Sequence, residues 1–316
     1  MDIIDKIFNQ DCIQGMRSLP DGCVNTCITS PPYYGLRDYG HDGQIGLEES
    51  PEAYVQKIVE VFREVKRVLR DDGTLWLNLG DSYAGNNSQA SNNGRAGFGN
   101  PREKVVNRTG EGLKTKDLIG IPWRVAFALQ ADGWYLRQDI IWHKPNPMPE
   151  SVTDRCTKAH EYIFLLSKSP KYYFDNEAIR EDASDVSVAR LKRGVSNHHK
   201  NINGAPGQTP HSMGKPRNHN PNRDVPTTRN PRSVWTVTTK PFKDAHFATY
   251  PEDLIVPCIL AGCPEGGLVL DPFMGAGTTA LVSKKLGRNY VGFELNEEYK
   301  KIADKRLNKT LGIFAL

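Results

Sequence analysis

Residues 268–280 read LVLDPFMGAGTTA, an apolar run that leads directly into a loop with two glycines. The apolar run predicts a buried strand, and residues 278–286 predict the helix that follows the loop. Gly275 and Gly277 have no side chains, so the loop backbone can come close to a ligand. A strand, a glycine loop and a helix in this order are typical of a nucleotide-type pocket.

A carboxylate follows the glycine loop at an informative distance. Residues 290–293 predict the next strand, and Glu294 stands about twenty residues after the loop, where a carboxylate can accept hydrogen bonds from ribose hydroxyls. No Gly-Lys-Ser/Thr closes the loop, which disfavours a phosphate-binding P-loop. A dinucleotide site stays open as an alternative, although the full glycine fingerprint is missing.

The rest of the chain alternates predicted strands and helices. Ser50 is expected to cap a helix that starts at Pro51 and stops at Asp72-Gly73, and Asn296 to cap a last helix through Leu307. Further strands are predicted over residues 24–29, 74–79, 139–142 and 161–166. The alternation predicts an α/β fold, a doubly wound and mostly parallel sheet with helices on its faces.

Composition excludes several classes of protein. No run approaches the ~20 apolar residues of a membrane-spanning helix, and the N-terminal residues are acidic where a secretory signal has positive charge. We therefore expect a cytoplasmic protein without membrane partners. The six cysteines form no CxxC pair, which indicates reduced thiols and no metal site.

Positive charge is concentrated in residues 186–240. This segment has ten Lys or Arg against one acid, Asp224, and so more than accounts for the net charge of +4. A basic segment attached to a slightly acidic body indicates a polyanionic partner such as nucleic acid, and a solvated basic insert without function is the alternative. The candidate contacts are Arg190, Lys192, Arg193, Lys215, Arg217, Arg223, Arg229 and Arg232.

A second motif, Ser30-Pro31-Pro32-Tyr33, comes directly after a predicted strand. Here the chain resembles the amino-methyltransferases of DNA, whose signature is [DNS]PP[YFW], and DPFMGAGTT resembles their cofactor motif. The resemblance covers most of the chain, and the order of the motifs is similar to the permuted beta class. It implies a Rossmann-like methyltransferase fold, S-adenosylmethionine as cofactor, S-adenosylhomocysteine as product, double-stranded DNA as partner and no metal.

The resemblance also assigns residues to the cofactor. Residues 246–251 look like the segment that precedes the cofactor loop, and Asp11-Cys12 resembles the acidic position on the adenine side. Residues 139–149 and 160–174 resemble later motifs of the catalytic domain. The cofactor residues so implied are Asp11, Cys12, Phe247, Thr249, Pro251, Asp271, Pro272, Phe273, Gly275, Gly277, Thr278 and Glu294.

The chemistry of amino-group methylation explains the residue types of the SPPY motif. An exocyclic amino nitrogen is a poor nucleophile until acceptors draw on its hydrogens, and Ser30 Oγ and the Pro31 carbonyl can be those acceptors. Pro31 and Pro32 fix the backbone and remove competing N–H donors. The target base must leave the duplex, and stacking on Tyr33, worth ~1–3 kcal/mol, helps to offset that cost. We expect direct transfer without a covalent intermediate.

The sequence leaves alternatives open for the target base and for the class of reaction. Serine in the first position of the motif is more often associated with N4 of cytosine, which we favour, and N6 of adenine is the alternative. Cytosine C5 methylation needs a cysteine nucleophile, and Pro257-Cys258 lies in LIVPCILAGC, which predicts a core helix. An RNA or small-molecule methyltransferase and a non-catalytic DNA-binding protein are the remaining rivals.

These assignments predict three regions. Residues 1–185 form the catalytic part, residues 186–240 an inserted target-recognition region, and residues 241–316 the cofactor-binding part. Residues 84–116, rich in Gly, Asn, Ser and Arg, predict a mobile loop, which is either a second candidate for embracing the duplex or mobile without a function. By analogy with the beta class, a homodimer and a cognate restriction endonuclease are further candidate partners.

Overall fold

A computed structural model describes residues 3–36, 41, 43–85, 112–193, 225–240 and 249–314, the side chains of residues 190–193, 311, 313 and 314 excepted. Within these residues eight strands form one sheet. In spatial order they are β1 (Lys6–Asn9), β10 (Asn289–Glu294), β9 (Leu268–Asp271), β2 (Val24–Thr29), β3 (Leu69–Leu79), β5 (His160–Ser167), β4 (Tyr135–His143) and β8 (Val234–Thr236).

The sheet is mostly parallel, as predicted. The five strands from β1 to β3 are all parallel, with Thr26 opposite Val269 and Cys27 opposite Leu270 where β2 meets β9. Only β5 runs against its neighbours, β3 and β4, and β8 is parallel to β4. The carboxyl ends of the parallel strands therefore meet at one edge of the sheet.

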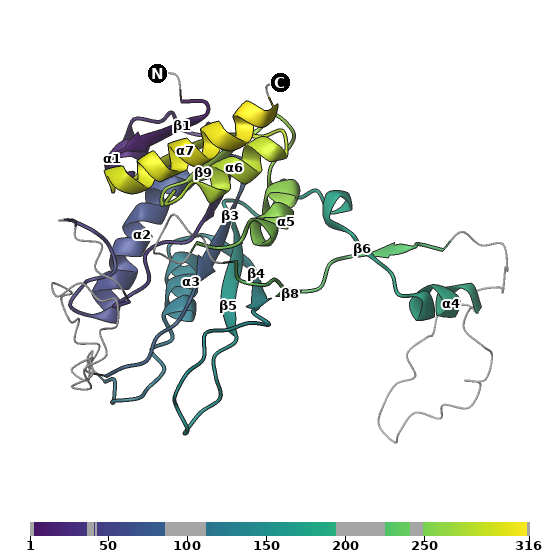
Figure 1. Cartoon of the computed structure of the whole chain (residues 1–316), viewed down its shortest axis with the longest axis horizontal. Helices are drawn as coiled ribbons and strands as arrows, with labels where there is room; N and C mark the ends of the chain where they lie inside the picture. The colour runs from purple at the N-terminus through teal and green to yellow at the C-terminus, as the bar shows by residue number, and fades with distance from the viewer. Residues whose placement is uncertain are drawn as a thin grey trace. The chain divides into compact units, whose positions relative to one another are not determined.

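Helices cover both faces of the sheet (Figure 1). The helices α1 (Cys12–Arg17), α2 (Pro51–Val68) and α3 (Ile121–Ala131) bury apolar side chains against one face, in a core with Leu75, Leu77 and Phe164. The helices α6 (Thr278–Lys285) and α7 (Glu297–Phe314) form a second core with Ile7 and Tyr290. The remaining helix of this body, α5 (Glu252–Gly262), contacts α6 and β2.

The predicted helix starts are confirmed. Ser50 Oγ accepts a hydrogen bond of 3.1 Å from Ala53 N at the start of α2, with Pro51 in the first turn. Asn296 Oδ1 accepts one of 2.8 Å from Glu298 N at the start of α7. This last helix continues past the expected end at Leu307 to Phe314.

The predicted stop of α2 at Asp72-Gly73 is wrong. The helix ends at Val68, because Leu69 is already extended (φ −68°, ψ 140°) and starts β3. The Gly73 carbonyl accepts a hydrogen bond from Lys168 N at 3.2 Å, and the Asp72 carbonyl accepts one from Tyr173 N at 2.8 Å. The tertiary pairing of these residues overrides the local helix-breaking signal.

A second compact unit spans Ile179–Arg232. It contains α4 (Asp185–Arg193) and the antiparallel pair β6 (Glu181–Asp182) and β7 (Thr228–Arg229), and the 3-10 turn η2 (Glu177–Ile179) leads into it. The expected insert, residues 186–240, differs from this unit at both ends. The reason is that β6 pairs with β7 inside the unit, whereas β8 joins the main sheet beside β4.

The structure describes only the ends of the predicted loop over residues 84–116. Ala84 N donates to the Asp117 carbonyl at 2.7 Å, and Lys116 N donates to the Ala84 carbonyl at 2.8 Å, so the two ends are joined. Residues 86–111, and with them the prediction of a mobile loop, lie outside the described residues. In the described parts of the chain, no helix has both the length and the apolar character needed to cross a bilayer.

Candidate functional site

A cavity of about 850 Å³ opens where the parallel strands end. Each of the five neighbouring strands β1, β10, β9, β2 and β3 contributes the residues just after its carboxyl end, which is where open α/β sheets bind ligands. The lining includes Asp11 after β1, Ser30 to Tyr33 after β2, Gly80 and Asp81 after β3, Pro272 to Gly275 after β9, and Leu295 after β10. The SPPY loop and the glycine loop therefore face the same cavity.

The two loops are tied together below the cavity by Asp271. Thr29, the last residue of β2, donates a hydrogen bond of 2.6 Å from Oγ1 to Asp271 Oδ1. Thr279 and Tyr250 donate to Oδ2 at 2.5 and 3.1 Å. Burial raises the pKa of Asp271, and these hydroxyl donors oppose that rise. Asp271 is fully buried, so its carboxylate holds the loop from behind and does not face the cavity.

Glycine is needed at positions 275 and 277 of the cofactor loop for two different structural reasons. Gly275 has φ +52°, and a Cβ there would meet no atom closer than 3.9 Å, so its open side is the cavity. Gly277 has φ +76°, and a Cβ there would lie 2.9 Å from Cβ of Ala303 on α7. Gly277 therefore permits close packing of α7, and only Gly275 leaves its backbone open to a ligand.

Glu294 closes the cofactor side of the cavity. Its Oε2 accepts a hydrogen bond of 2.8 Å from Gly275 N, and its Oε1 accepts one of 2.8 Å from Asn296 N. Burial raises the pKa of Glu294, and the two backbone donors counteract this. Each oxygen keeps a second lone pair, so the carboxylate can still accept hydroxyl hydrogens from a ligand.

The structure places most, but not all, of the predicted cofactor residues in the cavity wall. Pro251 stands at the start of α5, outside the lining, together with Asp271 and Gly277. Phe247 lies outside the described residues. The predicted residues that line the cavity are Asp11, Cys12, Thr249, Pro272, Phe273, Gly275, Thr278 and Glu294.

The SPPY loop is held by α2 on one side and faces the cavity on the other. Tyr54 on α2 donates a hydrogen bond of 2.9 Å to the Pro32 carbonyl. Among the described residues no donor reaches the Pro31 carbonyl, and the nearest polar partner of Ser30 Oγ is the Tyr33 hydroxyl at 3.4 Å. Both acceptors predicted for an amino group are thus available at the cavity wall.

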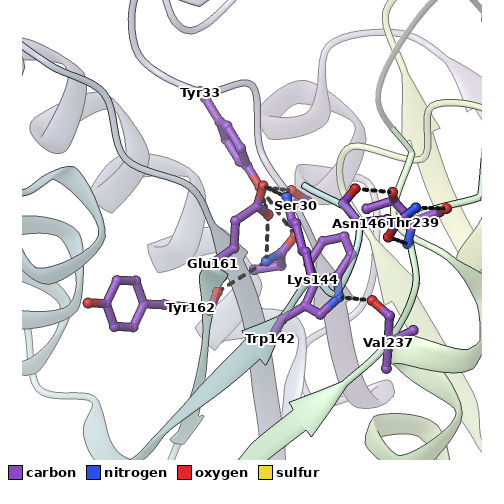
Figure 2. A network of polar contacts seen from close by, with 10 residues as sticks. Ser30, Tyr33, Trp142, Lys144, Asn146, Glu161, Tyr162, Val237 and Thr239 are labelled. Atoms are coloured by element: carbon purple, nitrogen blue, oxygen red, sulfur yellow. Dashed lines mark hydrogen bonds and ion pairs between the residues drawn. The ribbon is translucent and has the colours of Figure 1, made fainter. Parts of the chain in front are cut away.

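The hydroxyl end of Tyr33 is fixed by Glu161 (Figure 2) and by Asn78, two residues that were not among the predicted site residues. The Tyr33 hydroxyl donates 2.7 Å to Glu161 Oε2 and lies 3.3 Å from Asn78 Oδ1. Burial and the Glu161 charge raise the pKa of Tyr33 well above its usual value, so the hydroxyl stays a donor. The ring packs on Gly80, where a Cβ would lie 2.5 Å from Tyr33 Cε2.

The network continues into β4. Lys144 forms an ion pair with Glu161 and lies 4.3 Å from the centroid of the Trp142 ring. The Trp142 Nε1–H donates to the Val237 carbonyl at 2.8 Å, which fixes the indole (Figure 2). One signal could have pointed here, because Asn78 interrupts the apolar strand TLWLNL with a polar side chain that turns out to be buried.

A second lysine gives this side of the cavity positive character. Lys158 lines the cavity, and its buried Nζ has no hydrogen-bond partner within the described part of the chain. Burial lowers its pKa, while the charges of Asp81 and Glu161 oppose that change. An ammonium group that is buried without a partner is costly, so this wall favours a ligand with acceptor atoms.

The cysteine alternative does not fit the structure. Cys258 lies inside α5, is 1% exposed, and burial raises the pKa of its thiol far above the usual value. A nucleophilic cysteine needs an accessible group with a lowered pKa. Cys258 is therefore a core residue, as its apolar sequence context predicted.

The basic segment is only partly described. Arg229 and Arg232 pair with Glu181, at 3.2 and 3.5 Å, inside the second unit. Arg190, Lys192 and Arg193 belong to α4, whose side chains at these positions are not described, and Lys215, Arg217 and Arg223 lie outside the described residues.

Comparison with known proteins agrees with this geometry. The family model described as DNA methylase, for N6 and N4 methyltransferases, matches residues 24–305. The chain is 48% identical to the Type II methyltransferase M.Cfr9I of Citrobacter freundii, over 95% of this chain and 87% of that protein. It is 47% identical to M.SmaI of Serratia marcescens, over 96% and 90%.

The chain belongs to the N6/N4 DNA methylase family. The resemblance found in the sequence is thereby confirmed. The methylase also shares its fold with the PvuII DNA methyltransferase, described as cytosine-N4-specific, at a TM-score of 0.62 and 17% identity over 95% of this chain and 85% of that one. The SAM complex of M1.HpyAVI gives a TM-score of 0.53 and 17% identity over 96% and 98%.

Proposed function

We propose that this methylase transfers a methyl group from S-adenosylmethionine to an exocyclic amino nitrogen in double-stranded DNA, with N4 of cytosine as the target and N6 of adenine as the alternative. The observation that carries the proposal is that Ser30 to Tyr33 and Gly275 line one cavity. Since β2 and β9 are neighbouring parallel strands, the two loops emerge side by side.

The cofactor side of the cavity fits S-adenosylmethionine. The open backbone at Gly275 leaves room that a Cβ would fill, and the Glu294 carboxylate beside it can accept ribose hydroxyls. Asp11 and Phe273 add an acid and an aromatic face to the same wall. The cofactor supplies an electrophilic methyl group on a sulfonium.

The chain's own residues prepare the target nitrogen. Ser30 Oγ and the Pro31 carbonyl accept the amino hydrogens, which returns lone-pair density to the nitrogen. The base stacks on the Tyr33 ring, whose orientation is set by Glu161 and Asn78. Catalysis is then a matter of holding two reactants in line, without a covalent enzyme intermediate.

The choice of cytosine rests on Ser30. Serine is neutral and accepts hydrogen bonds less strongly than the aspartate that the family associates with adenine. A cognate restriction endonuclease and a homodimer are further proposals, the first supported by relatives that are Type II methyltransferases.

A tritiated-methyl assay tests the proposal. Label from S-adenosylmethionine should enter duplex DNA, and Ser30→Ala should lose most of this activity while cofactor affinity, measured by calorimetry, is kept. Ser18→Ala is the matched control, since Ser18 ends α1 away from the cavity lining and donates to the Gly15 carbonyl. Label in RNA alone, or DNA binding without cofactor binding, would overturn the proposal.

A further inference from the structure

Met148 is an apolar side chain that the structure holds in solvent at the rim of the cavity. It is 86% exposed, yet it belongs to the residues that line the cavity. It lies on the segment between β4 and β5, four residues after the network residue Lys144. A single exposed methionine needs no explanation by itself, but the backbone on both sides of Met148 is unusually constrained.

The backbone on both sides of Met148 is stiff. Pro147 and Pro149 flank it, and Pro145 precedes them, so φ is fixed at alternate positions. Asn146 holds the segment to Thr239, three residues after the end of β8, through two hydrogen bonds. Its Nδ2 donates 3.1 Å to the Thr239 carbonyl, and its Oδ1 accepts 3.0 Å from Thr239 N (Figure 2).

Glu150 provides the matching anchor on the other side. Its carboxylate pairs with Arg155 at 2.6 Å and accepts a hydrogen bond of 3.2 Å from Lys158 N. Met148 therefore stands between two fixed points, each two residues away. Such a support holds the backbone of Met148 at the rim of the cavity, while the side chain keeps its own rotations.

The chemistry of the side chain and its surroundings selects the occupant. Methionine is unbranched and polarisable, and it makes favourable contacts with aromatic faces in irregular gaps. One side chain is too small an area for a stable protein interface. Lys158 and Lys240 line the same cavity, where the Lys158 ammonium is buried without a partner in the described part of the chain and Lys240 pairs with Asp253 at 2.6 Å, so this wall favours an anionic ligand. Stacked bases flanked by phosphates meet both conditions.

We propose that Met148 enters the base stack of the duplex and fills the gap that the extruded target base leaves. The inference rests on the proposed function, because it needs a base to leave the helix. Inserted apolar side chains stabilise unstacked steps in other DNA-binding proteins. Met148 thus lowers the cost of extrusion and takes no part in methyl transfer itself.

The test compares two duplexes after the methylated position has been mapped by sequencing. In one duplex the target base is paired, and in the other it faces an abasic site, so that extrusion costs less. Met148→Ala should lower kcat/KM about tenfold on the paired duplex and less than about twofold on the abasic one. Met148→Leu should stay close to wild type on both.

Val152→Ala is the matched control. Val152 is an exposed apolar residue of the same segment, at 41% exposure, but it does not line the cavity. It should leave both rates unchanged, and Met148→Ala should leave cofactor affinity and the melting temperature unchanged.

Several results would overturn the inference. They are an equal loss on both duplexes, no loss on either, a loss with Val152→Ala as large as with Met148→Ala, or a Met148→Ala protein with a changed sedimentation state. A wild-type protein that methylates neither duplex would instead overturn the proposed function, so the two failures are distinguishable.

Discussion

The hydroxyl of Thr29, at the end of β2, donates a hydrogen bond of 2.6 Å to the buried carboxylate of Asp271, at the end of β9. The two residues are far apart in the sequence, and each directly precedes a loop that lines the cavity. This contact fixes the relative position of the base-binding loop and the cofactor loop. A methyl transferase needs that position to be constant, because misplacement of reactants is costly in rate.

Replacement of Thr29 by Val should therefore impair cofactor binding as well as stability. Loss of a donor to a buried carboxylate should lower the free energy of unfolding by ~1–3 kcal/mol and also weaken cofactor binding. Thr26→Val is the control, since Thr26 is buried in the same strand and bonds to Thr74 at 2.9 Å. Urea unfolding and calorimetry measure both effects. Equal weakening of cofactor binding in the two variants would contradict the linking role of Thr29.

Tyr33 should show separate contributions from its ring and its hydroxyl. Tyr33→Ala removes stacking worth ~1–3 kcal/mol, which corresponds to about a 5- to 150-fold fall in kcat/KM. Tyr33→Phe keeps the ring and loses only the contacts of the hydroxyl, chiefly the hydrogen bond to Glu161, so its loss of activity should be smaller. Cofactor affinity should stay unchanged in both. Full activity of the Ala variant would exclude stacking.

Glu294 predicts how cofactor binding depends on pH. The ionised carboxylate is the form that accepts hydroxyl hydrogens, and burial raises its pKa. As the pH falls, affinity should therefore begin to fall above the ordinary glutamate value of about 4.3. Calorimetry of Glu294→Gln should show weaker binding with a flatter pH profile. Glu297→Gln, at an exposed glutamate that pairs with Lys301, should keep the wild-type profile, and an unchanged profile in Glu294→Gln would refute the assignment.

The basic segment predicts a salt-dependent affinity for DNA. If its cations displace counterions from phosphates, the logarithm of the binding constant should fall linearly with the logarithm of the salt concentration. Replacing Lys215, Arg217 and Arg223 by Gln should reduce the slope by about one per residue that contacts a phosphate. Filter binding across a salt series measures the slope. A slope unchanged by all three substitutions would remove this segment from the DNA contact.

Much of the fold follows from local signals in the sequence. Ser50 with Pro51, and Asn296 before Glu298, are capping arrangements whose partners lie within three residues, so the sequence contains both sides of each contact. The glycine loop is similarly local. The prediction that α2 ends at Asp72-Gly73 was wrong because the helix-breaking signal is local. The residues that pair with Asp72 and Gly73, Tyr173 and Lys168, are remote in the sequence.

The network around Tyr33 could not be predicted in the same way. Asn78 lies in β3, Glu161 in β5 and Lys144 directly after β4, so no one stretch of sequence contains all three, although Lys144 and Glu161 fall in segments that resemble family motifs. They meet only because β5 runs antiparallel between β3 and β4, which brings its first residues to the edge where the other strands end. The separate roles of Gly275 and Gly277 likewise needed the position of α7.

The central claim is that the methyl group reaches an exocyclic amino nitrogen of a base held at Ser30 to Tyr33. Duplex DNA labelled by the wild-type protein, digested to nucleosides and separated by chromatography, tests it most directly. The account predicts label in N4-methylcytosine. Label in 5-methylcytosine would contradict it, because no amino group would then have accepted the methyl.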